Sequence, residues 1–223
     1  MSIEERLESI KKDLPSNVTL VAVSKFHSED EILKAYHVGQ KLFGENLVQE
    51  LRRKHENLPA DIEWHFIGHL QRNKVKYIVP FISLIHSVDT PELLTEINRQ
   101  GQKYGRQVPV LLQLHLAKEE TKFGFSPEEC RQFMDEGKWK ELKNIRIDGL
   151  MTMASNVEDL ETVRSEFNLA NELFQEYKSQ YFAREDHFHI RSWGMSNDYT
   201  IAIEEGSTMI RIGSLIFGPR PHQ

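Results

Sequence analysis

The chain has 223 residues, of which 39% are hydrophobic and 28% are charged, with a formal net charge of −6. This balance is typical of a soluble globular protein, and the acidic excess gives no general attraction for nucleic acid or anionic membranes. The single cysteine, Cys130, excludes an internal disulfide and fits a reducing compartment. Because no apolar run resembles a secretory signal or a membrane span, we expect a cytoplasmic protein.

Strand-like and helix-like segments alternate along the chain. Apolar runs rich in β-branched residues predict strands at residues 18–23, 41–43, 63–67, 81–86, 108–116, 145–151, 187–193 and 208–212. Amphipathic patterns with capping residues predict helices at residues 2–13, 28–37, 45–57, 69–79, 126–136, 157–181 and 196–206, a helix from 90 that ends near Gly101 or Gly105, and a last turn at 213–217. Roughly eight strand–helix units in this length favour a closed (β/α)8 TIM barrel, in one domain of residues 1–223, over a doubly wound open sheet.

Lys25 ends the first buried strand, VTLVAVSK. In parallel barrels the active site lies at the carboxyl ends of the strands, so this amine stands where chemistry is expected. A free lysine has a pKa of roughly 10.4, and desolvation or a nearby cation is needed before it can form an imine with an aldehyde. From its position alone, Lys25 is better interpreted as a solvated lysine at a strand end.

Two turns near the C-terminus are suited to a phosphate group. Ser196 is predicted to cap a helix, and Gly213 and Ser214 follow the last strand, so backbone N–H groups would be open to an anion. Barrels commonly bind phosphate after their last two strands. The alternative is that Gly194, Gly206 and Gly213 are ordinary turn residues.

Arg211 lies between apolar neighbours in the last strand. A charged residue in such a place must point at a partner or at the mouth of the barrel, and a heteroaromatic ring nitrogen would serve as the partner.

Several segments resemble one known family when taken together: VAVSK, FGEN, WHFIGHLQRNK, HSVD, ETKFGF, GLMTMA, GMSND and AIEEGSTMIRIGSLIFG. The chain is similar over nearly its whole length to the YggS/PROSC family of pyridoxal phosphate homeostasis proteins, which resemble the N-terminal barrel of alanine racemase. The resemblance implies a (β/α)8 barrel that holds pyridoxal 5′-phosphate (PLP) as a Schiff base. It also implies a role in buffering PLP or delivering it to PLP-dependent apoenzymes, as a monomer or weak dimer.

The same resemblance implies which residues contact the cofactor. Lys25 would be the Schiff-base lysine. Ser196, Gly213 and Ser214 fall in the phosphate-binding turns, and Arg211 falls beside the pyridine nitrogen. Asn46 falls in the segment near the ring.

The identity of Arg211 bears on catalysis. An arginine can only donate to the ring nitrogen, which then stays unprotonated and makes a weak electron sink. Since the sequence ends at Gln223, soon after the last predicted strand, we also expect the second domain of alanine racemase to be absent. We therefore expect a carrier with an open site, not an efficient racemase. Trp193 and Arg191, which depart from the family's expected pattern, stand beside the phosphate turn, where they would either crowd it or re-aim it and so affect cofactor occupancy.

Two alternatives stay open at this stage. One is a PLP-dependent, racemase-like enzyme. The other is a metal hydrolase, for which His187 and His189 on one strand could gather with His65 and His86 at the barrel mouth. Cys130 is expected to have a packing or surface role, and the basic segment 71–76 to be a solvated face with no nucleic-acid site.

Overall fold

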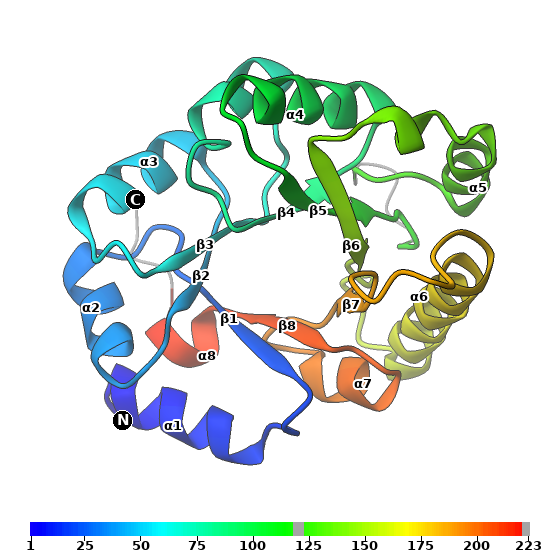
Figure 1. Cartoon of the computed structure of the whole chain (residues 1–223). Coiled ribbons are helices and arrows are strands. Elements are labelled where there is room, and N and C mark those ends of the chain that lie inside the picture. Colours follow the sequence, from blue (N-terminus) through cyan, green and yellow to red (C-terminus); the bar gives the residue numbers. More distant parts are fainter. Residues whose placement is uncertain (118–122, 220–223) are drawn as a thin grey trace.

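The computed structural model describes residues 1–117 and 123–219, and within these ranges eight parallel strands close into one barrel in chain order. Figure 1 looks along the barrel axis, with the helices forming an outer ring. The strands are β1 (Thr19–Val23), β2 (Leu42–Glu45), β3 (Glu63–Phe66), β4 (Leu84–Val88), β5 (Val108–Gln113), β6 (Ile145–Met151), β7 (Ile190–Ser192) and β8 (Met209–Ile212). The prediction of a (β/α)8 barrel is confirmed.

Helices and short 3₁₀ turns connect these strands on the outside of the barrel (Figure 1). They are α1 (Ile3–Asp13), α2 (Glu29–His37), α3 (Val48–Asn57), η1 (Arg72–Tyr77), α4 (Pro91–Lys103), α5 (Pro127–Glu136), η2 (Lys138–Glu141), α6 (Leu160–Tyr181), α7 (Tyr199–Glu204) and α8 (Ser214–Phe217). Ser28 closes a capping box with Glu31, as the SEDE pattern predicts. The described helices include none that combines the length and apolar character needed to cross a membrane.

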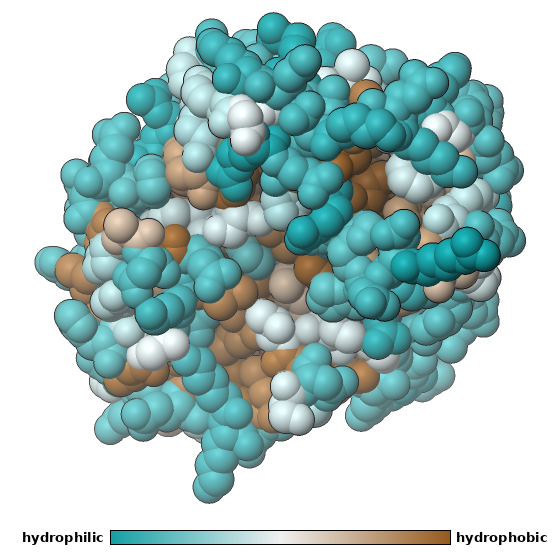
Figure 2. All heavy atoms as spheres, in the orientation of Figure 1, coloured by the Kyte–Doolittle hydropathy of each residue, from teal (hydrophilic) through white to brown (hydrophobic). Residues whose placement is uncertain are grey.

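The barrel separates two apolar regions. A large cluster fills the space between the strands and the helices, while a small inner cluster contains Val21, Leu84, Leu111, Met151 and Met209. Because side chains alternate along a strand, the inner cluster forms a layer that closes the barrel below its carboxyl end. Figure 2 shows that hydrophilic side chains cover most of the face seen in Figure 1, with hydrophobic ones toward the middle.

Several predicted boundaries are wrong. The helix expected at 69–79 is the short 3₁₀ turn η1, and the strand expected at 81–86 is β4, which begins at Leu84. Ser196 does not cap a helix: α7 begins after Asp198, whose carboxylate accepts a hydrogen bond from the Met195 backbone N–H at 2.5 Å.

The expectation that Trp193 and Arg191 crowd the phosphate turn is also wrong. Side chains alternate along β7, so both residues point away from the barrel interior, into which Ser192 points. Trp193 is fully buried in the outer apolar cluster. Arg191 donates to Asn171 Oδ1 at 3.2 Å and lies over the Phe174 ring, both on α6.

Candidate functional site

A pocket of about 420 Å³ opens at the carboxyl ends of the strands. The turns after β1, β2, β3, β6, β7 and β8 line it. All six residues that the sequence singles out are in its wall: Lys25, Asn46, Ser196, Arg211, Gly213 and Ser214. The barrel thus brings together side chains that are up to 189 positions apart, counted from Lys25 to Ser214 as 214 − 25.

Lys25 lies two residues beyond the end of β1 and is half-buried. The backbone on its N-terminal side is tied to the sheet, because the Ser24 N–H donates to the Gly44 carbonyl at 3.0 Å. The His27 N–H then donates back to the Ser24 carbonyl at 3.1 Å, which makes a tight turn around Lys25. The side chain of Lys25 therefore starts from a fixed backbone at the pocket wall.

The turns after β7 and β8 meet at the other side of the pocket. The Gly213 N–H is 3.4 Å from Ser196 Oγ, so the hydroxyl links the two turns instead of capping α7. A Cβ atom at Gly213 would come within 3.2 Å of the Val23 carbonyl oxygen, so a larger residue would crowd the end of β1. Because Gly213 has no side chain, backbone atoms line this wall of the pocket.

Arg211 points from β8 into the barrel interior and is only 4% exposed. Its Nη1 donates to both the carbonyl and the hydroxyl of Ser192 at 2.7 Å, and its Nη2 donates to the Thr152 carbonyl at 2.9 Å. Burial lowers the pKa of Arg211 to about 10, so the guanidinium remains charged at neutral pH. Three of its five N–H donors are used in these bonds.

Two histidines extend this network across the barrel. His86 Nδ1 is 3.0 Å from Ser192 Oγ, and His86 Nε2 is 3.0 Å from His65 Nδ1. Burial lowers the pKa of His65 to about 4 and holds the pKa of His86 well below its usual value, where His65 and Arg211 lower it further. Both rings are therefore neutral at physiological pH, and they form a chain of hydrogen bonds that ends on Arg211.

The four histidines of the metal-hydrolase alternative do not come together. His65 and His86 are buried inside the barrel, whereas His187 stacks edge-on against Phe182 in a separate pocket beside α6. His189 is exposed and contacts the Asp186 carbonyl. Among the described residues no group of three or more potential ligands is placed to hold a metal ion.

Asn46 occupies the turn after β2. A Cβ atom at Gly68 would lie 2.4 Å from the Asn46 carbonyl oxygen, so the two turns pack backbone to backbone and fix Asn46 in place. The Asn46 side-chain Oδ1 is buried and has no hydrogen-bond partner among the described residues. It is thus an acceptor that a ligand in the pocket could satisfy.

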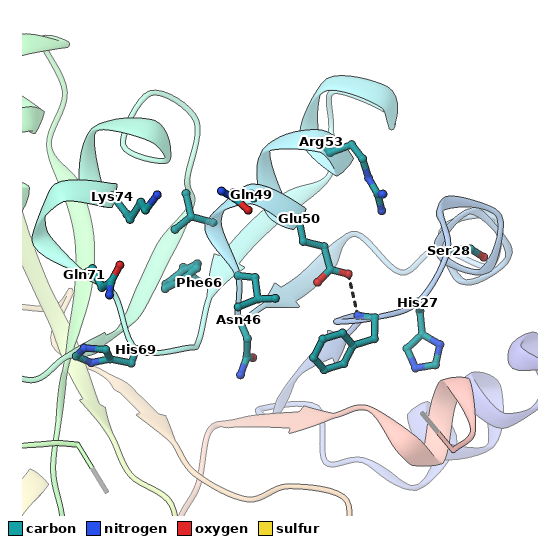
Figure 3. A pocket seen from close by; sticks show the side chains of 13 residues that line it. His27, Ser28, Asn46, Gln49, Glu50, Arg53, Phe66, His69, Gln71 and Lys74 are labelled. Atoms are coloured by element: carbon teal, nitrogen blue, oxygen red, sulfur yellow. Dashed lines mark hydrogen bonds between the residues drawn. The ribbon is translucent and has the colours of Figure 1, made fainter. Parts of the chain in front are cut away.

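A second, wider groove of about 970 Å³ adjoins this pocket and shares His27 and Asn46 with it. Figure 3 shows Asn46 and Glu50 in the middle of the groove, between Lys74 on one side and Arg53 on the other. No sequence pattern predicts this groove, because it forms only where the loops after β1, β2 and β3 meet.

Cys130 is fully buried in α5, where burial raises the pKa of its thiol to about 12. A protonated, enclosed thiol is a poor nucleophile, which agrees with the packing role expected for this residue.

The family description "Alanine racemase, N-terminal domain" matches residues 1–221. The chain is 41% identical to the pyridoxal phosphate homeostasis protein of Aquifex aeolicus, over 91% of this chain and 87% of that one. It is 36% identical to the human protein of the same name, over 99% of this chain and 83% of that one.

Solved structures give the same result. PipY of Synechococcus elongatus with PLP bound aligns with a TM-score of 0.87 and 35% identity, over 97% of this chain and all of that one. Alanine racemase of Clostridium difficile aligns with a TM-score of 0.76 at 14% identity, which shows the shared fold, and this chain covers 57% of it. The chain therefore belongs to the family of pyridoxal phosphate homeostasis proteins, which is built on the barrel of the alanine racemase N-terminal domain.

Proposed function

We propose that residues 1–223 act as one PLP-binding domain that holds the cofactor through Lys25 and takes part in cytoplasmic PLP homeostasis. The observation that carries this proposal is the shared pocket, which unites an amine, a guanidinium and two backbone-lined turns. A volume of about 420 Å³ lies within the range of small-molecule sites. The PLP-bound relative supports the identity of the ligand.

The residues of the pocket fit the chemical groups of PLP. The Ser196 hydroxyl with the backbone at Gly213 and Ser214 would hold the phosphate, since backbone N–H groups and small residues suit an anion. The remaining N–H donors of Arg211 would reach the ring nitrogen. The buried Asn46 Oδ1 is an acceptor for the ring hydroxyl.

Lys25 would make the covalent bond. Its deprotonated Nζ would hold PLP through a C=N bond to the aldehyde carbon, with the carbonyl oxygen released as water. Bound PLP supplies an electron sink for amino-acid chemistry, but its strength depends on a protonated ring nitrogen. Arg211 stays charged at neutral pH and can only donate, so it opposes that protonation. We therefore propose buffering or delivery of PLP to apoenzymes as the main role, with at most weak racemase-like activity.

An absorbance titration tests the proposal. The purified protein is expected to take up PLP with a visible band typical of a protonated imine, and Lys25→Ala is expected to lose that band. Lys12→Ala, a substitution in α1 far from the pocket, is the matched control and should titrate like the native protein. A native protein that gives no band with added PLP would contradict the proposal, and fast α-proton exchange into amino acids would favour the enzyme instead.

A further inference from the structure

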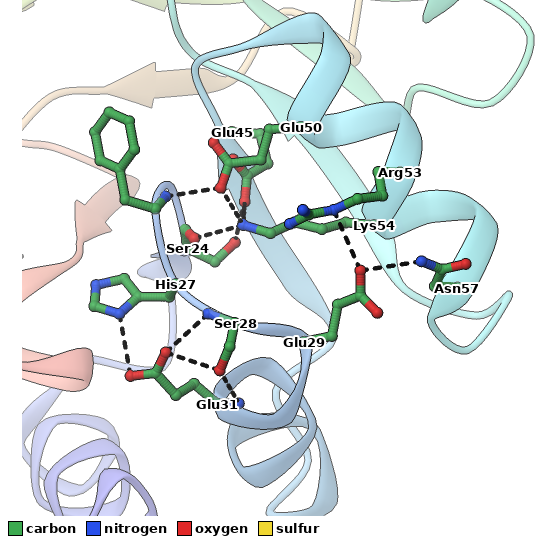
Figure 4. A network of polar contacts seen from close by, with 11 residues as sticks. Ser24, His27, Ser28, Glu29, Glu31, Glu45, Glu50, Arg53, Lys54 and Asn57 are labelled. Carbon is green, nitrogen blue, oxygen red and sulfur yellow. Dashed lines mark hydrogen bonds and ion pairs between the residues drawn. The ribbon is translucent and has the colours of Figure 1, made fainter. Parts of the chain in front are cut away.

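A buried ion cluster of Lys54, Glu45 and Glu50 contacts Ser24, the residue before Lys25 (Figure 4). Lys54 of α3 is completely buried, and its Nζ donates at 2.7 Å to Glu45 Oε1, to Glu50 Oε1 and to the Ser24 carbonyl. These bonds use all three N–H donors of the ammonium group. All hydrogen-bond donors of the buried Lys54 ammonium are therefore satisfied in this arrangement.

The cluster holds the backbone on both sides of Lys25. Before Lys25, the Ser24 carbonyl accepts from Lys54, and Ser24 Oγ donates to Glu45 Oε1 at 2.6 Å. After Lys25, the Phe26 N–H donates to Glu50 Oε1 at 2.8 Å. The two peptide groups that flank Lys25 are thus tied to the same ion pair.

Phe26, in the same turn, has an unfavourable backbone conformation. Among the described residues it is the only non-glycine with a positive φ, at 68°. A residue with a bulky side chain rarely adopts this conformation, and it persists where surrounding contacts determine it. The contact from Glu50 to the Phe26 N–H is such a constraint.

Stability alone does not explain the cluster. Burying charges has a large desolvation cost, and well-packed apolar residues of similar volume often stabilise a protein as well as a buried ion pair does. An apolar cluster could not hold the Ser24 carbonyl and the Phe26 N–H, however, because it offers no hydrogen bonds. The contacts that only a charged cluster supplies are those at the Lys25 turn.

We propose that Lys54, Glu45 and Glu50 are positioning residues that set the direction in which Lys25 enters the pocket. This inference rests on the proposed attachment of PLP to Lys25. A lysine side chain has four flexible bonds, so a fixed backbone on both sides limits where its Nζ can go. Loosening the turn should weaken PLP attachment without removing any group that touches the cofactor.

Glu50 gives the sharpest test, because a conservative variant retains its hydrogen bonds. Glu50→Gln keeps an acceptor for the Phe26 N–H and is expected to bind PLP within about threefold of the native protein. Glu50→Leu removes the acceptor and is expected to bind at least about tenfold more weakly. Glu29→Leu is the matched control: Glu29 pairs with Arg53 and Asn57 in the same region but does not touch the turn (Figure 4).

The readouts are the PLP affinity from the visible band, the visible circular dichroism of the bound cofactor, and borohydride trapping on the peptide that contains residue 25. Far-ultraviolet circular dichroism shows whether each variant folds. If Glu50→Leu does not fold, Lys54→Met combined with Glu45→Gln and Glu50→Gln replaces it. This neutral set buries no unpaired charge and still removes the contact to the Ser24 carbonyl.

The outcomes separate the two proposals. A native protein that traps no PLP at residue 25 overturns the proposed function itself. If the native protein traps PLP and folded Glu50→Leu, or the neutral set in its place, binds and traps it equally well, the positioning role is overturned while the proposed function stands. Tenfold weaker binding and an altered visible circular dichroism signal, with a normal Glu29→Leu, support the positioning role.

Discussion

Replacing Lys54 with methionine should strongly destabilise the fold at neutral and alkaline pH. Methionine has a similar volume and creates no large cavity, so the main effect is electrostatic. The substitution leaves the buried Glu45 carboxylate and the adjoining Glu50 without their cation. Breaking a buried ion pair in this way costs about 3–5 kcal/mol. For a domain of this size, that loss corresponds to a fall in melting temperature of roughly 6–20 °C.

The loss of stability caused by Lys54→Met should depend on pH, and the direction of this dependence follows from the pKa of Glu45. Burial raises the pKa of Glu45, while Lys54 opposes that rise, so removing Lys54 raises the pKa further. The folded variant then binds more protons than the unfolded chain at pH values above the usual range of a glutamate. Its stability must therefore fall as pH rises through that window. The destabilisation by Lys54→Met is expected to be smaller at pH 5.5 than at pH 8.

Urea denaturation of the native and variant proteins at both pH values measures this difference. The control is Lys54→Met with Glu45→Gln and Glu50→Gln, which should recover much of the lost stability at pH 8 because no charge is left unpaired. A Lys54→Met protein that is within 1 kcal/mol of native at pH 8, or equally destabilised at both pH values, would refute the reasoning.

Three further substitutions test the rest of the site. Ser192→Ala removes the hydroxyl that accepts from Arg211 and should cost about 1–3 kcal/mol in urea denaturation, whereas a neutral result would show that water replaces it. His65 has a pKa lowered from 6.5 to about 4, so the unfolded chain binds more protons between these values and stability falls on acidification. Between pH 7 and pH 5 the free energy of unfolding of His65→Gln should therefore fall by about 2 kcal/mol less than that of the native protein. An identical pH dependence in the two proteins would contradict this. Gly68→Ala places a Cβ atom 2.4 Å from the Asn46 carbonyl oxygen and should weaken PLP binding in the absorbance titration. Gly105→Ala strains a turn with φ of 61° outside the pocket, so it should lower stability but leave PLP binding unchanged.

Much of the fold could be predicted because alternation and strand composition are local properties. Each predicted strand overlaps an observed one, and parallel strands linked by helices have few ways to close. The candidate residues then fall on one pocket as a consequence of barrel geometry, since the turns that follow the strands meet at one end. Which of these residues bind PLP remains a prediction.

Which residues of β7 face the barrel interior could not be predicted from the sequence. The apolar pattern extends over 187–193, whereas the strand is Ile190–Ser192, and its short length leaves the inward positions undetermined. Proximity in sequence places Trp193 beside the phosphate turn, but its side chain packs in the outer core. The prediction that Ser196 caps a helix was wrong because serine and aspartate are both common N-cap residues. Asp198, not Ser196, is the N-cap residue of α7.

Contacts across the barrel were also beyond sequence reasoning. The chain from His65 through His86 and Ser192 to Arg211 joins four strands, and its members become neighbours only when the barrel closes. Lys54 did leave a signal. It follows Val48 and Leu51 at a spacing of three on the buried face of α3, where a charge requires a partner.

The most direct test of the account is borohydride reduction of the PLP-loaded protein, followed by peptide mass analysis. Reduction converts the C=N bond into a stable C–N bond, so the modified residue can be identified. The account predicts that the peptide containing Lys25 carries the reduced cofactor in near-stoichiometric amount. Modification spread over surface lysines, with the Lys25 peptide unmodified, would contradict it.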